Sequence, residues 1–220
     1  MFSLIFKKFT AVTIFSIAMG FMEAAVVVYL RELYYPEGFC FPLKIIPINI
    51  LFVELGREMS TIVMLILIGF ITGKTLLEKF CYFLYSFGIW DIFYYIWLKV
   101  ILNWPPSLLT WDLLFLIPVP WVGPVLAPLI VALTMSITAG GIIYFQEKGY
   151  SFKINKLDWI LGISSALLIF LSFIWDFSRI VAQQIPIKYH WQLFISGELL
   201  GVYTVFRIFK NSDRTNPKFS

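Results

Sequence analysis

The feature that most constrains this chain is a series of six long apolar runs separated by short polar segments. A helix that spans a bilayer needs about 20 mostly apolar residues, and each run is roughly that long. The sequence therefore predicts an all-α, polytopic transmembrane helix bundle with about six spanning helices, forming a single integral membrane domain over residues 1–220. The predicted helices cover residues 9–30, 47–72, 76–102, 122–145, 157–177 and 191–209.

The composition agrees with a membrane protein. The chain is 60% hydrophobic and 14% charged, with a mean hydropathy of +0.86, whereas soluble domains carry about 25% charged residues. The net charge is +4, but the basic residues lie between apolar runs and form no patch within a soluble module. We therefore expect no nucleic-acid partner. The expected partner is the lipid bilayer, and association with other membrane proteins or with further copies of the chain stays open.

The basic residues also predict an orientation. Most of the 17 Lys and Arg residues fall on the side that holds both termini. The positive-inside rule places that side in the cytoplasm. We therefore expect a multi-pass protein of the cell (inner) membrane, the plasma membrane, with both termini cytoplasmic. Lys7 and Lys8 precede a first run that is too long for a signal peptide, so it is predicted to be retained as a helix.

A proline-rich segment, residues 103–128, separates the third and fourth runs. Because proline interrupts helices, only residues 107–117 have room for a short helix. This helix is predicted to lie at the interface or to re-enter the membrane, with an extracytoplasmic loop carrying an amphipathic helix as the alternative. Two glycine pairs at a spacing of four, Gly69 with Gly73 and Gly197 with Gly201, could permit close helix contacts.

Ionisable side chains inside the apolar runs are the candidate functional residues. Each costs about 2.5–3.5 kcal/mol in lipid, so such groups usually face a cavity or a partner. With the predicted orientation they all fall in the outer half of the bilayer, which predicts an acidic cavity open to the extracytoplasmic side. The primary candidates are Glu23, Glu54, Arg57, Glu58, Asp91 and Glu198. The secondary candidates are Asp112, Asp176, Arg179 and His190.

Spacing predicts partners for some of these residues. Glu54, Arg57 and Glu58 share one helix face, so Arg57 is expected to pair with either carboxylate. This cluster is either a packing element or an ion-binding site. The expected partner of Glu23 is Arg57 or a Tyr or Lys of another helix. For Glu198, the structural alternative is a hydrogen bond between helices.

The tyrosines one turn after Asp91, Tyr94 and Tyr95, are expected to hold its carboxylate. At the end of the fifth run, Asp176 and Arg179 are expected to form a local ion pair.

No cofactor is evident from the sequence. His190 is the only histidine, which excludes bis-histidine haem ligation within the chain. A mixed metal site of His190 and Glu198 stays open. Cys40 and Cys81 are predicted on opposite sides of the membrane, which disfavours a disulfide.

The sequence contains no P-loop, H-E-x-x-H, G-x-S-x-G or nucleotide-binding fingerprint. The favoured hypothesis is binding or transport of a cation, proton or small polar solute through the acidic cavity. One alternative is an intramembrane enzyme that acts on a lipid or isoprenoid substrate. The other is a non-catalytic subunit of a membrane complex.

Overall fold

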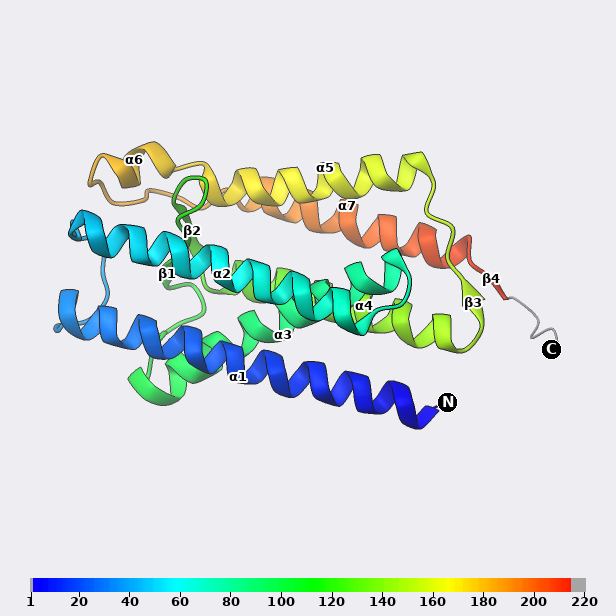
Figure 1. The fold of residues 1–220 in the computed structure, drawn as a ribbon. Coiled ribbons are helices and arrows are strands. Elements are labelled where there is room, and N and C mark those ends of the chain that lie inside the picture. Colours follow the sequence, from blue (N-terminus) through cyan, green and yellow to red (C-terminus); the bar gives the residue numbers. More distant parts are fainter. Residues whose placement is uncertain (1, 215–220) are drawn as a thin grey trace.

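The computed structural model describes residues 2–214, and long helices dominate this part of the chain (Figure 1). Helix accounts for 71% of the structure, which confirms the all-α prediction. A helix forms in each of the six apolar runs, and the bounds of the third are as predicted. The fourth differs from the prediction at its start, because residues 122–124 belong to a strand and the helix begins at Leu126. The long helices are α1 (Phe2–Tyr34), α2 (Ile48–Thr72), α3 (Leu76–Leu102), α4 (Leu126–Glu147), α5 (Lys156–Ile174) and α7 (Trp191–Lys210). A five-residue helix, α6 (Phe177–Val181), follows α5.

Local chemistry explains where several helices begin and end. The Thr75 side chain accepts a hydrogen bond from the Glu78 backbone N–H and caps the start of α3. At the other end of α3, Asn103 adopts a left-handed conformation with φ of 51°, a backbone geometry that asparagine tolerates and that terminates helices. A reciprocal capping box of Asn155 and Asp158 begins α5.

Among the residues that the structure describes, four helices are long and apolar enough to cross a membrane: Phe6–Tyr34, Leu126–Glu147, Lys156–Val181 and Trp191–Lys210. The predicted count of about six spans is therefore supported for four helices. The other two long helices, α2 and α3, carry most of the primary candidate residues. The start of α1 and the end of α7 lie at one end of the bundle (Figure 1).

Helix α3 is the centre of the larger packing group. Helices α1, α2 and α4 all pack against it, whereas α5 and α7 pack mainly on each other. Both glycine pairs lie at such contacts, as predicted. A Cβ on Gly69 would lie 2.6 Å from the Lys79 carbonyl oxygen on α3, and one on Gly197 would lie 2.7 Å from the Ile169 side chain on α5. The absence of a side chain at each glycine lets these backbones approach closely.

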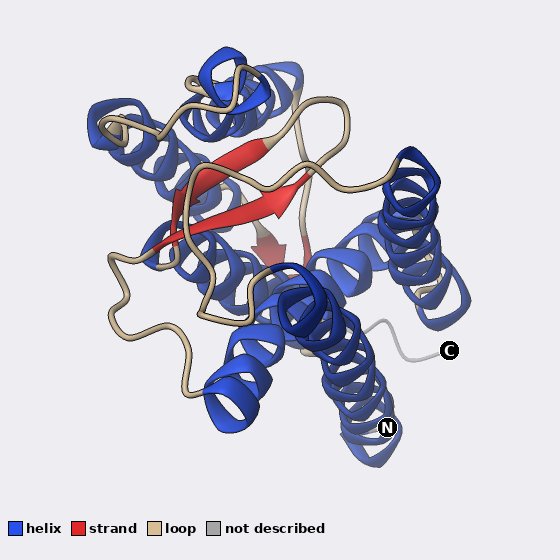
Figure 2. Ribbon diagram, turned by 90° about the vertical axis from the view of Figure 1, so that its left-hand side faces the viewer, coloured by secondary structure: helices blue, strands red, loops and turns tan. Residues whose placement is uncertain are grey.

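The proline-rich segment differs from the prediction, because residues 107–117 form no helix. Strand β1 (Trp111–Phe115) instead pairs antiparallel with β2 (Trp121–Pro124), as Figure 2 shows in red. Prolines at 118 and 120 lie in the connection between the two strands, where the chain reverses. The paired strands satisfy backbone polar groups of each other. The hairpin is buried among the helices, and Asp112 and Val122 are each 1% exposed.

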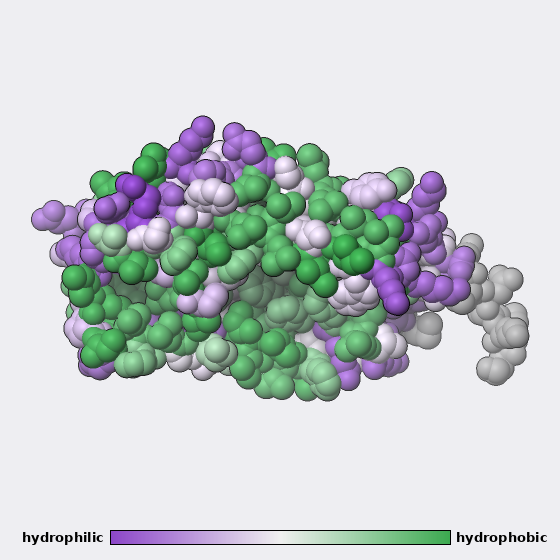
Figure 3. Space-filling view, turned by 90° about the horizontal axis from the view of Figure 1, so that it is seen from above, coloured by the Kyte–Doolittle hydropathy of each residue, from purple (hydrophilic) through white to green (hydrophobic). Residues whose placement is uncertain are grey.

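The surface has the polarity expected of a membrane protein. On the face drawn in Figure 3, hydrophobic residues cover the middle of the molecule and hydrophilic residues gather at its two ends. Many large apolar side chains are exposed on the helices, among them Ile71 at 77% and Leu199 at 65%. Such contiguous apolar surface marks an interaction site, here contact with lipid. The same face is hollowed near its centre (Figure 3).

Candidate functional site

A cavity of about 890 Å³ lies between the α1–α4 group and the α5–α7 pair. It extends from Lys44 and Ile46, just before α2, to Asp158 and Ile208 near the opposite end of the bundle. Most of its lining is apolar and aromatic, and we call it the crevice below. All six primary candidates line it: Glu23, Glu54, Arg57, Glu58, Asp91 and Glu198. Of the secondary candidates, Asp112 does so as well.

Arg57 is the centre of a three-residue ionic cluster between α1 and α2. It forms an ion pair with Glu23 of α1 through Nη1. It also donates to Oε2 of Glu54 from Nη2 at 2.7 Å and from Nε at 3.0 Å. Thr61 donates to the other oxygen of Glu23 at 3.1 Å. The expected pairing of Arg57 with Glu54 and with Glu23 is confirmed, and both carboxylates have partners.

Glu58 bonds to the hairpin segment and not to Arg57. The Leu116 backbone N–H donates to both of its carboxylate oxygens, at 3.0 and 2.9 Å. Leu116 directly follows β1, so this bond joins α2 to the hairpin. Glu58 is 5% exposed, and it satisfies a backbone donor that the hairpin ladder leaves free.

Asp112 of β1 forms the most buried ion pair of the crevice. Arg31 Nη2 donates to its Oδ1 and the Tyr95 hydroxyl to its Oδ2, both at 3.1 Å. The Arg31 guanidinium also stacks on Trp104, 3.7 Å from the ring centroid. Burial raises the pKa of Asp112 to about 6, and Arg31 and Tyr95 act in the opposite direction. Tyr95 thus holds Asp112, and the expectation that it would hold Asp91 is wrong.

Glu198 makes the interhelical hydrogen bond considered as its structural role. Thr134 of α4 donates to its Oε2 at 3.0 Å. This contact joins α7 to α4, two helices that otherwise contact each other little. The bond contributes about 0.6 kcal/mol by the average for membrane helices.

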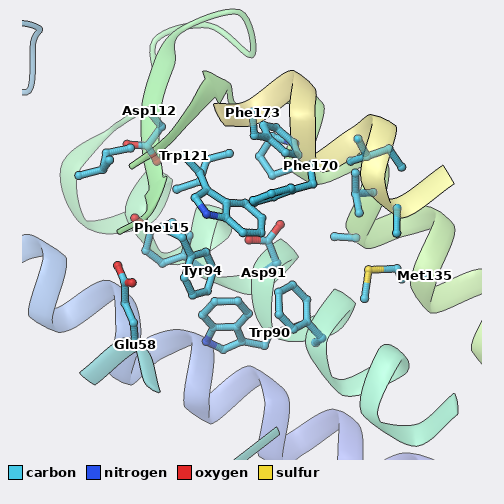
Figure 4. Close-up of a pocket in the computed structure, with 18 of the residues that line it drawn as sticks. Glu58, Trp90, Asp91, Tyr94, Asp112, Phe115, Trp121, Met135, Phe170 and Phe173 are labelled. Carbon is cyan, nitrogen blue, oxygen red and sulfur yellow. The ribbon is translucent and has the colours of Figure 1, made fainter. Parts of the chain in front are cut away.

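Asp91 is the primary candidate without a partner. Within residues 2–214, its carboxylate has no hydrogen bond or ion pair. Figure 4 shows this side chain pointing into the crevice, with aromatic side chains around it. Tyr94 and Trp90, which also line the crevice, lie next to it on α3. On the other side of the space are Trp121 of β2 and Phe170 of α5 (Figure 4).

The remaining secondary candidates lie outside the crevice lining. Asp176 accepts from the Ile187 backbone N–H at 3.1 Å, and Arg179 donates to the Ile185 carbonyl at 3.4 Å. The expected ion pair between Asp176 and Arg179 is therefore wrong, because each side chain bonds the loop after α6. The His190 ring lies 4.7 Å from that of Trp175, centroid to centroid, and His190 does not line the cavity with Glu198.

Sequence reasoning missed several residues of the crevice. Arg31 is not among the candidates that the sequence predicts, yet it is 7% exposed and faces the same cavity as Glu23. Its spacing was a usable signal, since Glu23, Val27 and Arg31 repeat every four residues and all line the crevice. Trp121 had no such signal, because only the hairpin brings it to α3 and α5.

No group of three His, Cys, Asp or Glu side chains that could hold a metal ion occurs within residues 2–214. Both cysteines are free, with Cys40 exposed and Cys81 buried. Comparison with protein-family models, with curated proteins and with solved structures found no match for this chain.

Proposed function

We propose that this protein binds an amphipathic molecule of the lipid or isoprenoid class within the membrane. One observation carries the proposal: a single crevice is apolar along most of its length and also holds all the primary ionisable candidates. An apolar chain would lie along α5 and α7, and the polar end would lie near Asp91 and the hairpin.

The size and position of the crevice support this ligand class. Ligand pockets measure about 300–1,000 Å³ and are mostly apolar with a few placed polar groups. At about 890 Å³, the crevice is within that range. The hollow on the apolar face of the molecule (Figure 3) offers a route from the hydrocarbon region of the bilayer.

A small polar solute or a metal cation fits the observations less well. Glu23, Glu54 and Glu58 already have ionic or hydrogen-bonding partners, so their capacity to bind a free cation is largely used. The apolar walls offer few replacements for the hydration shell that such a solute would lose.

The proposal includes the predicted topology. Six membrane crossings with both termini in the cytoplasm would put the β1–β2 hairpin on the extracytoplasmic side of the cell membrane. The distribution of Lys and Arg supports this orientation. The polar end of the ligand would then lie toward the outer leaflet.

Two glycine variants test the proposal. Gly162 on α5 lines the crevice and has no atom within 4 Å of a built Cβ, so Gly162→Trp would fill the open space without a local clash. Gly56 on α2 has equally open space but lies outside the lining, so Gly56→Trp is the matched control. Each variant is purified in a neutral maltoside detergent, and native mass spectrometry counts the lipids that stay bound.

We expect wild type and Gly56→Trp to retain lipid and Gly162→Trp to lose most of it. Equal retention in both variants, or no lipid on the wild type after supply of membrane lipid, would refute the proposal. Comparing the mass of added and recovered lipid in the same samples would reveal turnover, which would extend the proposal to an intramembrane enzyme.

A further inference from the structure

Asp91 differs chemically from every other carboxylate that lines the outer part of the crevice. Each of the other carboxylates there accepts from a donor within the chain. The donors are Arg57 for Glu23 and Glu54, a backbone N–H for Glu58, and Arg31 for Asp112. No Lys or Arg side chain bonds Asp91 within residues 2–214. An ionised carboxylate in apolar surroundings is costly unless a proton or a cation accompanies it. Asp91 is therefore neutralised either by a proton or by a cation from outside the chain, and its surroundings decide which kind of cation fits.

The surroundings of Asp91 are a continuous series of aromatic rings. Successive centroid distances are 5.2 Å from Phe87 to Trp90, 6.2 Å from Trp90 to Phe115, 5.7 Å from Phe115 to Trp121 and 4.8 Å from Trp121 to Phe170. These rings come from α3, β1, β2 and α5, and all line the crevice. In Figure 4 the Asp91 carboxylate points toward the ring of Trp121.

We infer that Asp91 and this ring series bind the ammonium group of an amphipathic amine, whose apolar chain occupies the rest of the crevice. This inference rests on the proposed function and specifies the headgroup. Aromatic faces attract organic cations, and rings arranged around a cation are the usual recognition site for alkylated ammonium groups. The carboxylate supplies the neutralising charge.

The same surroundings disfavour a metal ion. Calcium and magnesium require six or more oxygen ligands, or several retained waters, whereas the neighbours of Asp91 present mainly ring carbon. An ammonium group that carries carbon substituents needs few hydrogen bonds, and its substituents pack against rings. The binding site therefore matches an organic cation.

Two buried hydrogen-bond donors also line the crevice near the ring series. The indole N–H groups of Trp90 and Trp121 have no acceptor within the described part of the chain, and Trp90 is 3% exposed. Unsatisfied buried donors are rare and costly. An oxygen atom of the ligand that reached either N–H group would satisfy it.

The experiment compares two amphiphiles of equal chain length, hexadecyltrimethylammonium and uncharged hexadecanol. Each is titrated at known mole fraction in neutral maltoside micelles against the full chain, and binding is measured by native mass spectrometry. The protein has a net charge of +4, so its overall field repels the cation and cannot produce a preference for it. We expect wild type to bind the cation at least about tenfold more tightly than the alcohol.

Asp91→Asn should remove that preference, because the isosteric amide keeps the shape and loses the charge. Asp176→Asn is the matched control, since Asp176 lies outside the crevice lining, and it should keep the preference. Trp121→Leu retains the carboxylate and should weaken cation binding about 3- to 30-fold, so it tests the site independently if Asp91→Asn does not fold.

Equal affinity of wild type for the two amphiphiles would overturn the inference, as would a preference that survives Asp91→Asn. If Asp91→Asn does not fold, unchanged cation binding by Trp121→Leu would overturn it. These failures are distinguishable from failure of the proposed function. Hexadecanol binding that Gly162→Trp blocks would support the crevice even without a cation preference, whereas no binding of either amphiphile would refute both.

Discussion

The buried pair of Arg31 and Asp112 allows a quantitative test of how the hairpin is held in the bundle. The proposed perturbation is Arg31→Met, which keeps an apolar side chain of similar length against Trp104 and removes the charge. In the wild type, the side chains of Arg31 and Asp112 are 9% and 2% exposed. After the substitution, Asp112 keeps one hydrogen bond, from Tyr95.

The magnitude follows from the geometry. Removing one partner of a buried ion pair costs about 3–5 kcal/mol, because the remaining charge is uncompensated. Loss of the guanidinium stacked on Trp104 adds about 0.5–2 kcal/mol. The free energy of unfolding should therefore fall by at least about 3 kcal/mol at pH 8. The double variant Arg31→Met/Asp112→Asn should lose less than the single one, since it leaves no buried charge.

The decrease in the free energy of unfolding caused by Arg31→Met should also depend on pH. Burial already raises the pKa of Asp112 to about 6, and removal of Arg31 raises it further. A carboxyl with a folded-state pKa above its unfolded value stabilises the protein fully at low pH, and this contribution is lost as pH rises through the folded pKa. The destabilisation by Arg31→Met should accordingly be smaller at pH 5, where Asp112 is protonated, than at pH 8.

The cysteines provide the assay. Cys81 is 1% exposed, whereas Cys40 is exposed. In a Cys40→Ser background, a thiol-reactive dye therefore reports unfolding through Cys81 alone. Titration with SDS in mixed micelles then gives the free energy of unfolding for each variant. A loss below about 1 kcal/mol, the scale of an exposed pair, would refute the reasoning, as would equal losses at pH 5 and pH 8.

Two further predictions use the same assay. Gly197→Val should lower the free energy of unfolding by about 1–3 kcal/mol, because its Cβ would lie 2.7 Å from Ile169 and 3.0 Å from the Ser165 carbonyl oxygen. Gly162→Ala, with nothing within 4 Å, is the control and should be neutral or stabilising. Glu58→Leu should cost about 1–3 kcal/mol by leaving the Leu116 N–H without its acceptor. Glu58→Gln keeps an acceptor and should cost less, and equal losses would contradict the assigned bond.

Much of the candidate site was predictable as a set of residues, but not as a set of contacts. Spacing along α2 correctly associated Arg57 with Glu54, since residues one turn apart share a helix face. The same spacing allowed Glu58 as a partner, yet Glu58 turns to the backbone of Leu116. Likewise, Tyr95 is one turn from Asp91 but bonds Asp112. Helix periodicity specifies a face, and only the position of the neighbouring element decides which group is met there.

The apolar runs by themselves determined the helices, because hydrophobicity and the need to satisfy backbone groups in lipid are properties of contiguous sequence. The residue range of α3 was predicted from end to end, and its ends are also set locally, by Thr75 at the start and Asn103 at the end. The β1–β2 hairpin, the crevice and the unpaired state of Asp91 were decided only by tertiary structure. The hairpin pairs residues only 6 to 13 positions apart, but its place against the helices, like the crevice and the unpaired state of Asp91, depends on residues distant in the chain meeting in space. Local propensity contains no information about which of them will meet.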